Sequence, residues 1–239
     1  MIKELAALHK NQTLTLVPRE PHMNVVGSKW VFKAKLNANG TLDRLKAMLV
    51  AKGYHQVEGI DYTGTFSPVI KPGTIRLVLS LALVQRWDIR QLDVKNVFLH
   101  GFISEDIFMG QPTGMHDSIF PSHVCKLKKA LYGLKQAPRA WFDRFSSFLL
   151  ARGFFCSLDD PSLFILHSSL GTLNLLLYVD DMLLTRSNSK LLNDFVQLLH
   201  SEFAMKDLGS IHHFLGIEIQ RDNNSLHLSQ THYAYSILD

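Results

Sequence analysis

The sequence predicts an α+β fold, in which helices are combined with antiparallel strands. Segments with helical apolar spacing occur at 75–86 and 137–153, and segments typical of paired strands occur at 30–52 and 173–185. The chain has 239 residues, 46% of them hydrophobic and 19% charged, so it can bury a substantial core. A mixture of helices and hairpins in one chain of this composition is typical of the α+β class.

The first half contains the following predicted elements. Residues 1–16 predict a short amphipathic helix followed by an extended Thr-Leu-Thr-Leu segment. Residues 30–36 and 45–52 predict two strands of a basic β-hairpin, joined by a turn at Asn37-Ala38-Asn39-Gly40. A start signal at 71–74 precedes a buried helix at 75–86, and a strand that holds Asp93 follows at 89–98.

The second half predicts a similar mixture. Residues 137–153 read as a helix with Pro138 in its first turn and Gly153 at its end. Residues 173–185 predict strand, tight turn and strand, with Asp180 and Asp181 at the turn. An amphipathic helix at 188–203 follows, then a hairpin of 214–220 and 225–228 around 222–224, and the start of another helix at 237–239.

The charges are distributed unevenly along the chain. Residues 1–139 hold 19 Lys and Arg against 10 Asp and Glu, whereas residues 140–239 hold 6 against 11. A basic part joined to an acidic part favours a polyanionic partner together with a carboxylate site. A lysine-rich face exposed to solvent is the alternative. No apolar run reaches the roughly 18–20 residues that cross a bilayer, so no membrane partner is expected.

The pair Asp180-Asp181 lies between apolar strand segments. Two adjacent carboxylates held against a core repel each other and raise each other's pKa unless a cation lies between them. Carboxylate oxygens are the ligands that Mg²⁺ and Mn²⁺ prefer. Solvated turn-forming aspartates are the alternative interpretation.

Asp93 is a second candidate carboxylate, because it lies inside a predicted strand between Leu92 and Val94. An aspartate in such a place is rare unless it meets a partner, although it could also cap the end of the strand. Together, a strand with an inward Asp and a hairpin with Asp-Asp are the parts of a two-metal phosphoryl-transfer site.

Several ordered motifs resemble the reverse transcriptases of Ty1/copia-type retrotransposons. The strongest is Lys128-Lys129-Ala130-Leu131-Tyr132-Gly133-Leu134-Lys135-Gln136-Ala137-Pro138-Arg139-Ala140-Trp141. The others are collinear with it over nearly the whole chain: Gly27-Ser28-Lys29-Trp30-Val31-Phe32-Lys33, Leu49-Val50-Ala51-Lys52-Gly53-Tyr54-His55-Gln56, Gly59-Ile60-Asp61-Tyr62, Thr65-Phe66-Ser67-Pro68-Val69, Gln91-Leu92-Asp93-Val94-Lys95-Asn96, Phe98-Leu99-His100-Gly101, Tyr178-Val179-Asp180-Asp181 and Phe214-Leu215-Gly216-Ile217-Glu218.

The resemblance implies a right-hand polymerase fold with fingers, a ferredoxin-like antiparallel palm and the start of a thumb. A reverse transcriptase domain would then cover residues 1–239. The fingers would comprise about 1–90 and 105–140, the palm 91–104 and 141–220, and the palm end with a truncated thumb 221–239. The chain would be a fragment of a Pol polyprotein without its RNase H and integrase regions.

The resemblance also implies roles for individual residues. Asp93, Asp180 and Asp181 would form the catalytic site and bind two Mg²⁺ or Mn²⁺ ions. Nucleotide contacts would come from Lys35, Lys46, Phe98, Tyr132, Gly133 and Gln136, with the Phe98 ring excluding a ribose 2′-hydroxyl. Nucleic-acid contacts would come from Lys33, Lys135 and Arg139. A core role for Phe98 and plain solvation of Lys135 and Arg139 remain open.

The expected activity is RNA-directed DNA polymerisation, with an RNA template, a DNA primer or product, and dNTPs as partners. The expected location is intracellular, in the cytoplasm within virus-like particles or in the nucleus. Three positions depart from the family pattern: Met48 replaces an arginine, Val97 an alanine and Phe102 an aspartate. Because Met48 cannot pair with a triphosphate, an inactive nucleic-acid-binding relic of the same fold is the alternative.

Overall fold

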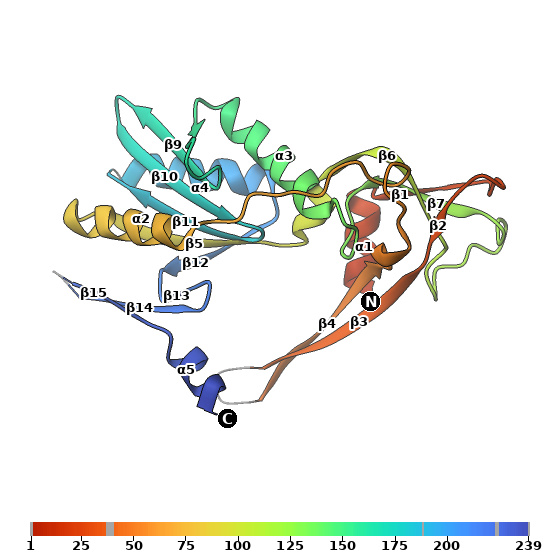
Figure 1. Ribbon diagram of the computed structural model, residues 1–239, viewed down its shortest axis with the longest axis horizontal. Helices are drawn as coiled ribbons and strands as arrows, with labels where there is room; N and C mark the ends of the chain where they lie inside the picture. Colours follow the sequence, from red (N-terminus) through yellow and green to blue (C-terminus); the bar gives the residue numbers. More distant parts are fainter. Residues whose placement is uncertain (1, 37–40, 188, 223–224, 239) are drawn as a thin grey trace. The chain divides into compact units, whose positions relative to one another are not determined.

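The computed structural model describes residues 2–36, 41–187, 189–222 and 225–238. The chain forms two compact units, and each unit is assembled from two separate segments (Figure 1). The first unit consists of residues 1–67 and 96–146, and the second of residues 68–95 and 147–239. The segment 68–90 thus belongs to the same unit as Asp93, while the division into fingers and palm stays a prediction.

A four-stranded sheet is the centre of the first unit, with strand order β1-β7-β6-β2. Strand β7 runs antiparallel to both β1 and β6, whereas β2 runs parallel to β6. The predicted N-terminal helix and extended segment are confirmed as α1 and β1, but the sequence interpretation missed β6 and β7. The bounds are α1 Ile2–Lys10, β1 Leu14–Val17, β2 Val25–Val26, β6 Phe102–Met109 and β7 Val124–Lys129.

The predicted basic hairpin is confirmed as the antiparallel pair β3 (Ser28–Leu36) and β4 (Leu42–Ala51). The turn that was predicted at 37–40 lies outside the described residues. After β4, a short 3₁₀ helix, η1 (Gly53–His55), leads into the segment that ends the first part of this unit.

A six-stranded sheet is the centre of the second unit, with strand order β12-β5-β11-β10-β9-β8. The predicted strand–turn–strand segment is confirmed as β10 and β11, while β9 and β12 were not predicted. The bounds are β5 Asp88–Val94, β8 Phe155–Cys156, β9 Leu163–Ser168, β10 Gly171–Tyr178, β11 Asp181–Arg186 and β12 Met205–Ser210.

Helices cover both faces of this sheet (Figure 1). The buried side chains of α2 (Pro72–Val84) form one apolar cluster with Ile89 of β5 and Leu183 of β11. On the other face, α4 (Ser189–Glu202) packs against β10 and β11. The predicted helix at 137–153 is confirmed as α3 (Ala137–Leu150). Within the described ranges, no helix combines the length and apolar character that a membrane crossing requires.

Two predicted strands are shorter than expected, because residues with positive φ interrupt them. The strand predicted at 89–98 ends at Val94, Asn96 has a φ of 52°, and a 3₁₀ helix, η2 (Val97–His100), follows. The strand predicted at 214–220 is divided by a turn at Leu215 and Gly216, where φ is 50° and 80°. This region forms a small three-stranded sheet, and α5 follows it. The bounds are β13 His213–Phe214, β14 Ile217–Arg221, β15 Leu226–Ser229 and α5 Thr231–Leu238.

Candidate functional site

The hairpin of β10 and β11 brings two carboxylates to the end of an apolar sheet. Tyr178 pairs with Asp181, so Val179 and Asp180 form a two-residue turn between the strands. Most side chains before and after this turn are fully buried, which fixes the pairing of the two strands. Val179 has a φ of 51°, a strained conformation for a β-branched residue. The turn geometry is therefore maintained by the surrounding sheet and not by the preference of Val179.

Asp93 lies directly opposite Asp181 on the neighbouring strand. The register of the antiparallel pair β5–β11 makes these two residues partners, and directly paired residues have their side chains on the same face. The N–H of Val94 also donates a 2.8 Å hydrogen bond to the carbonyl oxygen of Asp180, which ties the turn to the end of β5. Backbone pairing thus brings Asp93 next to Asp181 and its sequence neighbour Asp180, although Asp93 lies nearly ninety residues earlier in the chain.

The carboxylates act on one another electrostatically. Burial raises the pKa of Asp181, and the negative charges of Asp180 and Asp93 raise it further. A hydrogen bond with Gln91 and the nearby His213 act in the opposite direction. The sequence interpretation gave these last two neighbours no role, although Gln91 belongs to the same quoted motif as Asp93.

The donor chemistry of this group fits a divalent cation. Carboxylate oxygens that repel each other are stabilised when a hard cation such as Mg²⁺ or Mn²⁺ lies between them. Across the described parts of the chain, however, no three His, Cys, Asp or Glu side chains are arranged as a ready metal-binding group. The backbone therefore brings the aspartates together, while their side chains do not form a finished ligand set.

The segment around Tyr132 and Gly133, in the first unit, forms a second candidate site. The rings of Phe98 and Tyr132 meet edge to face, with centroids 4.8 Å apart. The N–H of Ala51 donates a 2.7 Å hydrogen bond to the carbonyl oxygen of Tyr132. Gly133 has a φ of 87°, and a Cβ there would collide with the carbonyl oxygen of Ala51. This segment can therefore approach β4 so closely only because residue 133 is glycine.

A buried network of polar side chains holds the next residues of this segment. Gln136 is only 3% exposed, and its amide accepts a 3.0 Å hydrogen bond from Gln56 and donates a 2.8 Å bond to the carbonyl oxygen of Asp61. Gln56 also accepts a bond from the N–H of Lys135. The expected nucleotide contact of Gln136 does not fit this burial, because its amide is already engaged inside the protein.

Asp61 contributes a carboxylate to this network and is only 1% exposed. Its Oδ2 accepts hydrogen bonds from the side-chain amide of Asn24 and from the N–H of Val57. Buried carboxylates are costly unless they are bonded in this way. Asp61 and Gln56 belong to the motifs quoted above, but the sequence interpretation gave them no role. Their positions in the motifs were the available signal.

The predicted nucleic-acid contacts of the same segment remain accessible. Lys135 is exposed, and its ammonium lies 2.9 Å from the hydroxyl of Tyr62 and 4.6 Å from the centre of that ring. Arg139 is also exposed and forms an ion pair with Asp143, with 3.6 Å between Nε and Oδ2. Neither contact buries the charged group, so both cations can also bind phosphate.

The hairpin of β3 and β4 concentrates positive charge. Lys33 pairs with Lys46, and Lys35 pairs with Arg44. Like charges directly opposite each other on a sheet destabilise it, and a polyanion would relieve this repulsion. On the same hairpin, Met48 pairs with Val31 and is half-buried.

The other two departures from the family pattern occupy different environments. Val97 is 1% exposed, in the interior of the first unit, whereas Phe102 is 61% exposed. The Lys129 ammonium lies 5.3 Å from the centre of the Phe102 ring, within cation–π range.

Comparisons with known proteins agree with the motifs. The chain is 48% identical over 239 residues to the "Retrovirus-related Pol polyprotein from transposon RE1" of Arabidopsis thaliana, covering 100% of this chain and 16% of that protein. It is 42% identical over 242 residues to the corresponding polyprotein from transposon TNT 1-94 of Nicotiana tabacum, covering 100% of this chain and 18% of that protein. The chain thus spans about a sixth of the length of these relatives. An apo telomerase from Candida tropicalis, with a TM-score of 0.42 at 10% identity over 95% of this chain and 59% of that one, is too distant to bear on the fold.

One family model covers nearly all of the chain. It matches residues 11–239 and is described as "Reverse transcriptase (RNA-dependent DNA polymerase)". Together with the Pol polyproteins of transposons, this match confirms the predicted resemblance to Ty1/copia-type elements. The chain belongs to the reverse transcriptase family.

Proposed function

We propose that the chain is the polymerase part of an RNA-directed DNA polymerase, which extends a DNA primer along an RNA template inside the cell. The observation that carries this proposal is the pairing of Asp93 with Asp181 beside the turn residue Asp180. Asp93, Asp180 and Asp181 would hold two Mg²⁺ or Mn²⁺ ions. When bound, these ions supply charge stabilisation to the attacking and leaving oxygens.

The reaction is a nucleotidyl transfer. The 3′-hydroxyl oxygen of the primer loses its proton to solvent water and forms a bond to the α-phosphorus of the incoming dNTP. The bond from that phosphorus to the oxygen shared with the β-phosphate breaks, and pyrophosphate leaves. The carboxylates of this chain serve to position the reacting groups, which is the main catalytic requirement of phosphoryl transfer.

The first unit would supply the substrate contacts. Lys35 and Lys46 would bind the triphosphate, and the rings of Phe98 and Tyr132 with Gly133 would line the sugar and base. Phe98 is half-buried in an edge-to-face contact with Tyr132, which supports a fixed ring that excludes a 2′-hydroxyl. Lys33, Lys135 and Arg139 would bind the template and primer backbones. Gln136 would position this segment from the interior.

Primer extension on poly-rA/oligo-dT with Mg²⁺ tests the proposal. The intact chain should incorporate dTTP, and Asp180→Asn should abolish incorporation while leaving the melting temperature within a few degrees. Asp194→Asn is the matched control, because Asp194 is an exposed carboxylate on α4 outside the site. Incorporation that survives Asp180→Asn would refute the assignment of this site.

An inactive relic that still binds nucleic acid is the second candidate function. Met48 supports it, because arginine would donate two charge-assisted hydrogen bonds to a triphosphate and methionine donates none. Filter binding without primer extension is its signature. If the missing arginine is the cause, Met48→Arg should raise kcat/KM for the nucleotide by about 10- to 150-fold, since a hydrogen bond to a charged group is worth roughly 1.5–3 kcal/mol.

A further inference from the structure

A polar cavity lies in the second unit at the start of β5. Its volume is about 380 Å³, which is within the range of small-ligand pockets. The end of β11, the segment that joins β12 to β13, and the end of β14 complete its walls. The lining residues are Asp88, Ile89, Arg90, Arg186, Ser210, Ile211, His212 and Arg221.

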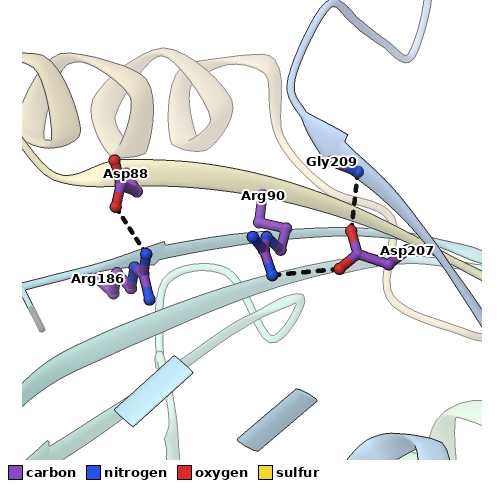
Figure 2. A network of polar contacts seen from close by, with 5 residues as sticks. All are labelled: Asp88, Arg90, Arg186, Asp207 and Gly209. Atoms are coloured by element: carbon purple, nitrogen blue, oxygen red, sulfur yellow. Dashed lines mark hydrogen bonds and ion pairs between the residues drawn. The ribbon is translucent and has the colours of Figure 1, made fainter. Parts of the chain in front are cut away.

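Three arginines that are far apart in the sequence meet at this cavity. Nη2 of Arg186 lies 2.7 Å from Oδ2 of Asp88, and Nη1 of Arg90 lies 3.2 Å from Oδ2 of Asp207 (Figure 2). Asp207 is held in turn by the N–H of Gly209. Arg221 instead donates a 2.8 Å hydrogen bond to the carbonyl oxygen of Trp87.

The lining has an excess of positive charge. It contains three guanidinium groups, of which Arg186 faces Asp88 and Arg90 faces Asp207, so the excess comes from Arg221. Arg221 contacts a neutral carbonyl, so this bond does not balance its charge. A concave surface lined mainly by one sign of charge concentrates the electrostatic potential and attracts ions of the opposite sign. His212 lines the same cavity.

The strand register separates this cavity from the aspartate site. Side chains alternate between the two faces along a strand, so Asp88 and Arg90 lie on the face opposite that of Asp93. Arg186 pairs with Asp88 and therefore lies on their face, whereas Asp181 pairs with Asp93. Figure 2 shows Arg90 and Arg186 on the side of β5 that faces away from α2. A strand of nucleic acid that crosses the aspartate face would not pass over these arginines.

We propose that this cavity binds a phosphate group, either free inorganic phosphate or the phosphate of a mononucleotide. Guanidinium groups match the oxygens of phosphate in pairs of parallel hydrogen bonds. Phosphate also carries enough charge to interact with several arginines at once. The volume leaves room for a nucleoside beside the phosphate. The site goes beyond nucleotide polymerisation and does not require that activity.

Isothermal titration of the whole chain with inorganic phosphate, and separately with AMP, tests the proposal in EDTA, which removes divalent ions. We expect saturable binding of one equivalent. Arg221→Gln should weaken it at least tenfold, since one charge-assisted hydrogen bond is lost. The affinity of Arg221→Lys should lie between those of the parent chain and Arg221→Gln, because lysine keeps the charge but lacks the planar guanidinium group.

Arg152→Gln is the matched control. Arg152 also donates one hydrogen bond to a backbone carbonyl, that of Phe148, at 2.9 Å, and it is not part of the cavity lining. The affinity of the Arg152→Gln variant for phosphate should differ from that of the parent chain by less than twofold. Tighter binding of AMP than of phosphate would identify a nucleotide as the source, and equal affinities would identify free phosphate.

Two results would overturn the proposal. The first is the absence of saturable binding of both probes to the unchanged chain. The second is an unchanged affinity in Arg221→Gln while its melting temperature stays that of the parent. An effect of Arg221→Gln on oligonucleotide binding without any effect on phosphate would also refute it and would indicate a nucleic-acid contact.

Discussion

The two units hold their candidate functional residues in different ways. In the second unit, Asp93 and Asp181 face each other because two apolar strands pair in one register. In the first unit, the segment of Gly133 and Gln136 is held by side-chain hydrogen bonds and by close contact with Ala51. Strand pairing depends only on a general apolar pattern, which many residues can supply. The hydrogen-bonded segment of the first unit requires particular side chains. The first unit should therefore tolerate fewer substitutions near its functional residues.

The two units also differ in net charge. The first unit holds 15 Lys and Arg against 9 Asp and Glu, and the second holds 10 against 12. The expected asymmetry between the halves of the sequence thus persists between the folded units. Positive charge is concentrated on the hairpin of the first unit, whereas Asp93 and Asp181 are paired at the strand ends of the second.

The largest expected effect is a loss of activity at the aspartate site of the second unit, which strand pairing assembles. Asp93→Asn should lower kcat/KM for primer extension at least a thousandfold, about 4 kcal/mol, because it removes one charge from the proposed ion-binding group. The free energy of unfolding should change by less than about 1 kcal/mol, since the strand pairing is unchanged. Steady-state incorporation and urea unfolding measure the two quantities. A large loss of stability would mean that the carboxylate also holds the sheet together.

Gly133→Ala should have the next largest effect, this time on stability. Alanine at a φ of 87° costs roughly 1–2 kcal/mol, and the collision with the Ala51 carbonyl adds to this, for a total of about 3 kcal/mol. Gly110→Ala is the control, because a Cβ there meets nothing within 4 Å and its φ is not positive. Equal urea midpoints for the two variants would contradict the close-contact interpretation.

A smaller effect is expected for the basic hairpin. Replacing Lys33, Lys35 and Lys46 together by glutamate should weaken binding to any oligonucleotide by about tenfold to hundredfold, near 1.4–2.8 kcal/mol. The dependence of affinity on salt should become less steep, because fewer counterions are released. Fluorescence anisotropy at several salt concentrations measures both. If the salt dependence stays the same, the hairpin is only a solvated face.

The smallest effect tests whether the second unit also has a residue held by side-chain bonds. Burial alone would raise the pKa of Asp160, but hydrogen bonds from Thr74, the N–H of Lys71 and Ser162 outweigh it and lower the pKa. The stabilisation is therefore present above the pKa of about 3.9 that an unfolded aspartate has, and it is lost as the pH falls through the folded value. Asp160→Asn should cost about 1–2 kcal/mol at pH 7.

The free energy of unfolding, measured as a function of pH on the acid side, tests the contribution of Asp160. In the parent chain, stability should fall below about pH 4, and in Asp160→Asn this fall should be smaller. Asp159→Asn is the control, because Asp159 is its exposed neighbour. Identical acid limbs in all three proteins would show that Asp160 does not contribute.

The two arrangements also differ in how far the sequence predicts them. The strand pair next to Asp180 was predictable because apolar residues flank the polar pair Asp180-Asp181 on both sides. The end of β5 at Val94 was not predicted, and Asn96, which adopts a left-handed conformation there, was only a weak local signal. The burial of Gln136 was likewise hidden, since its partners Gln56 and Asp61 lie 80 and 75 residues away in the chain. Local patterns do not reveal which distant side chains a polar residue will meet.

The segmented construction of the units has a consequence for folding of the nascent chain. Both neighbours of β5, which are β11 and β12, begin only at Asp181 and Met205. During synthesis on the ribosome, the apolar residues of β5 therefore stay unpaired until β11 and β12 have been synthesised. Long-range pairing of this kind slows folding and exposes intermediates to aggregation. We expect the isolated chain to refold slowly, with yields that fall as protein concentration rises.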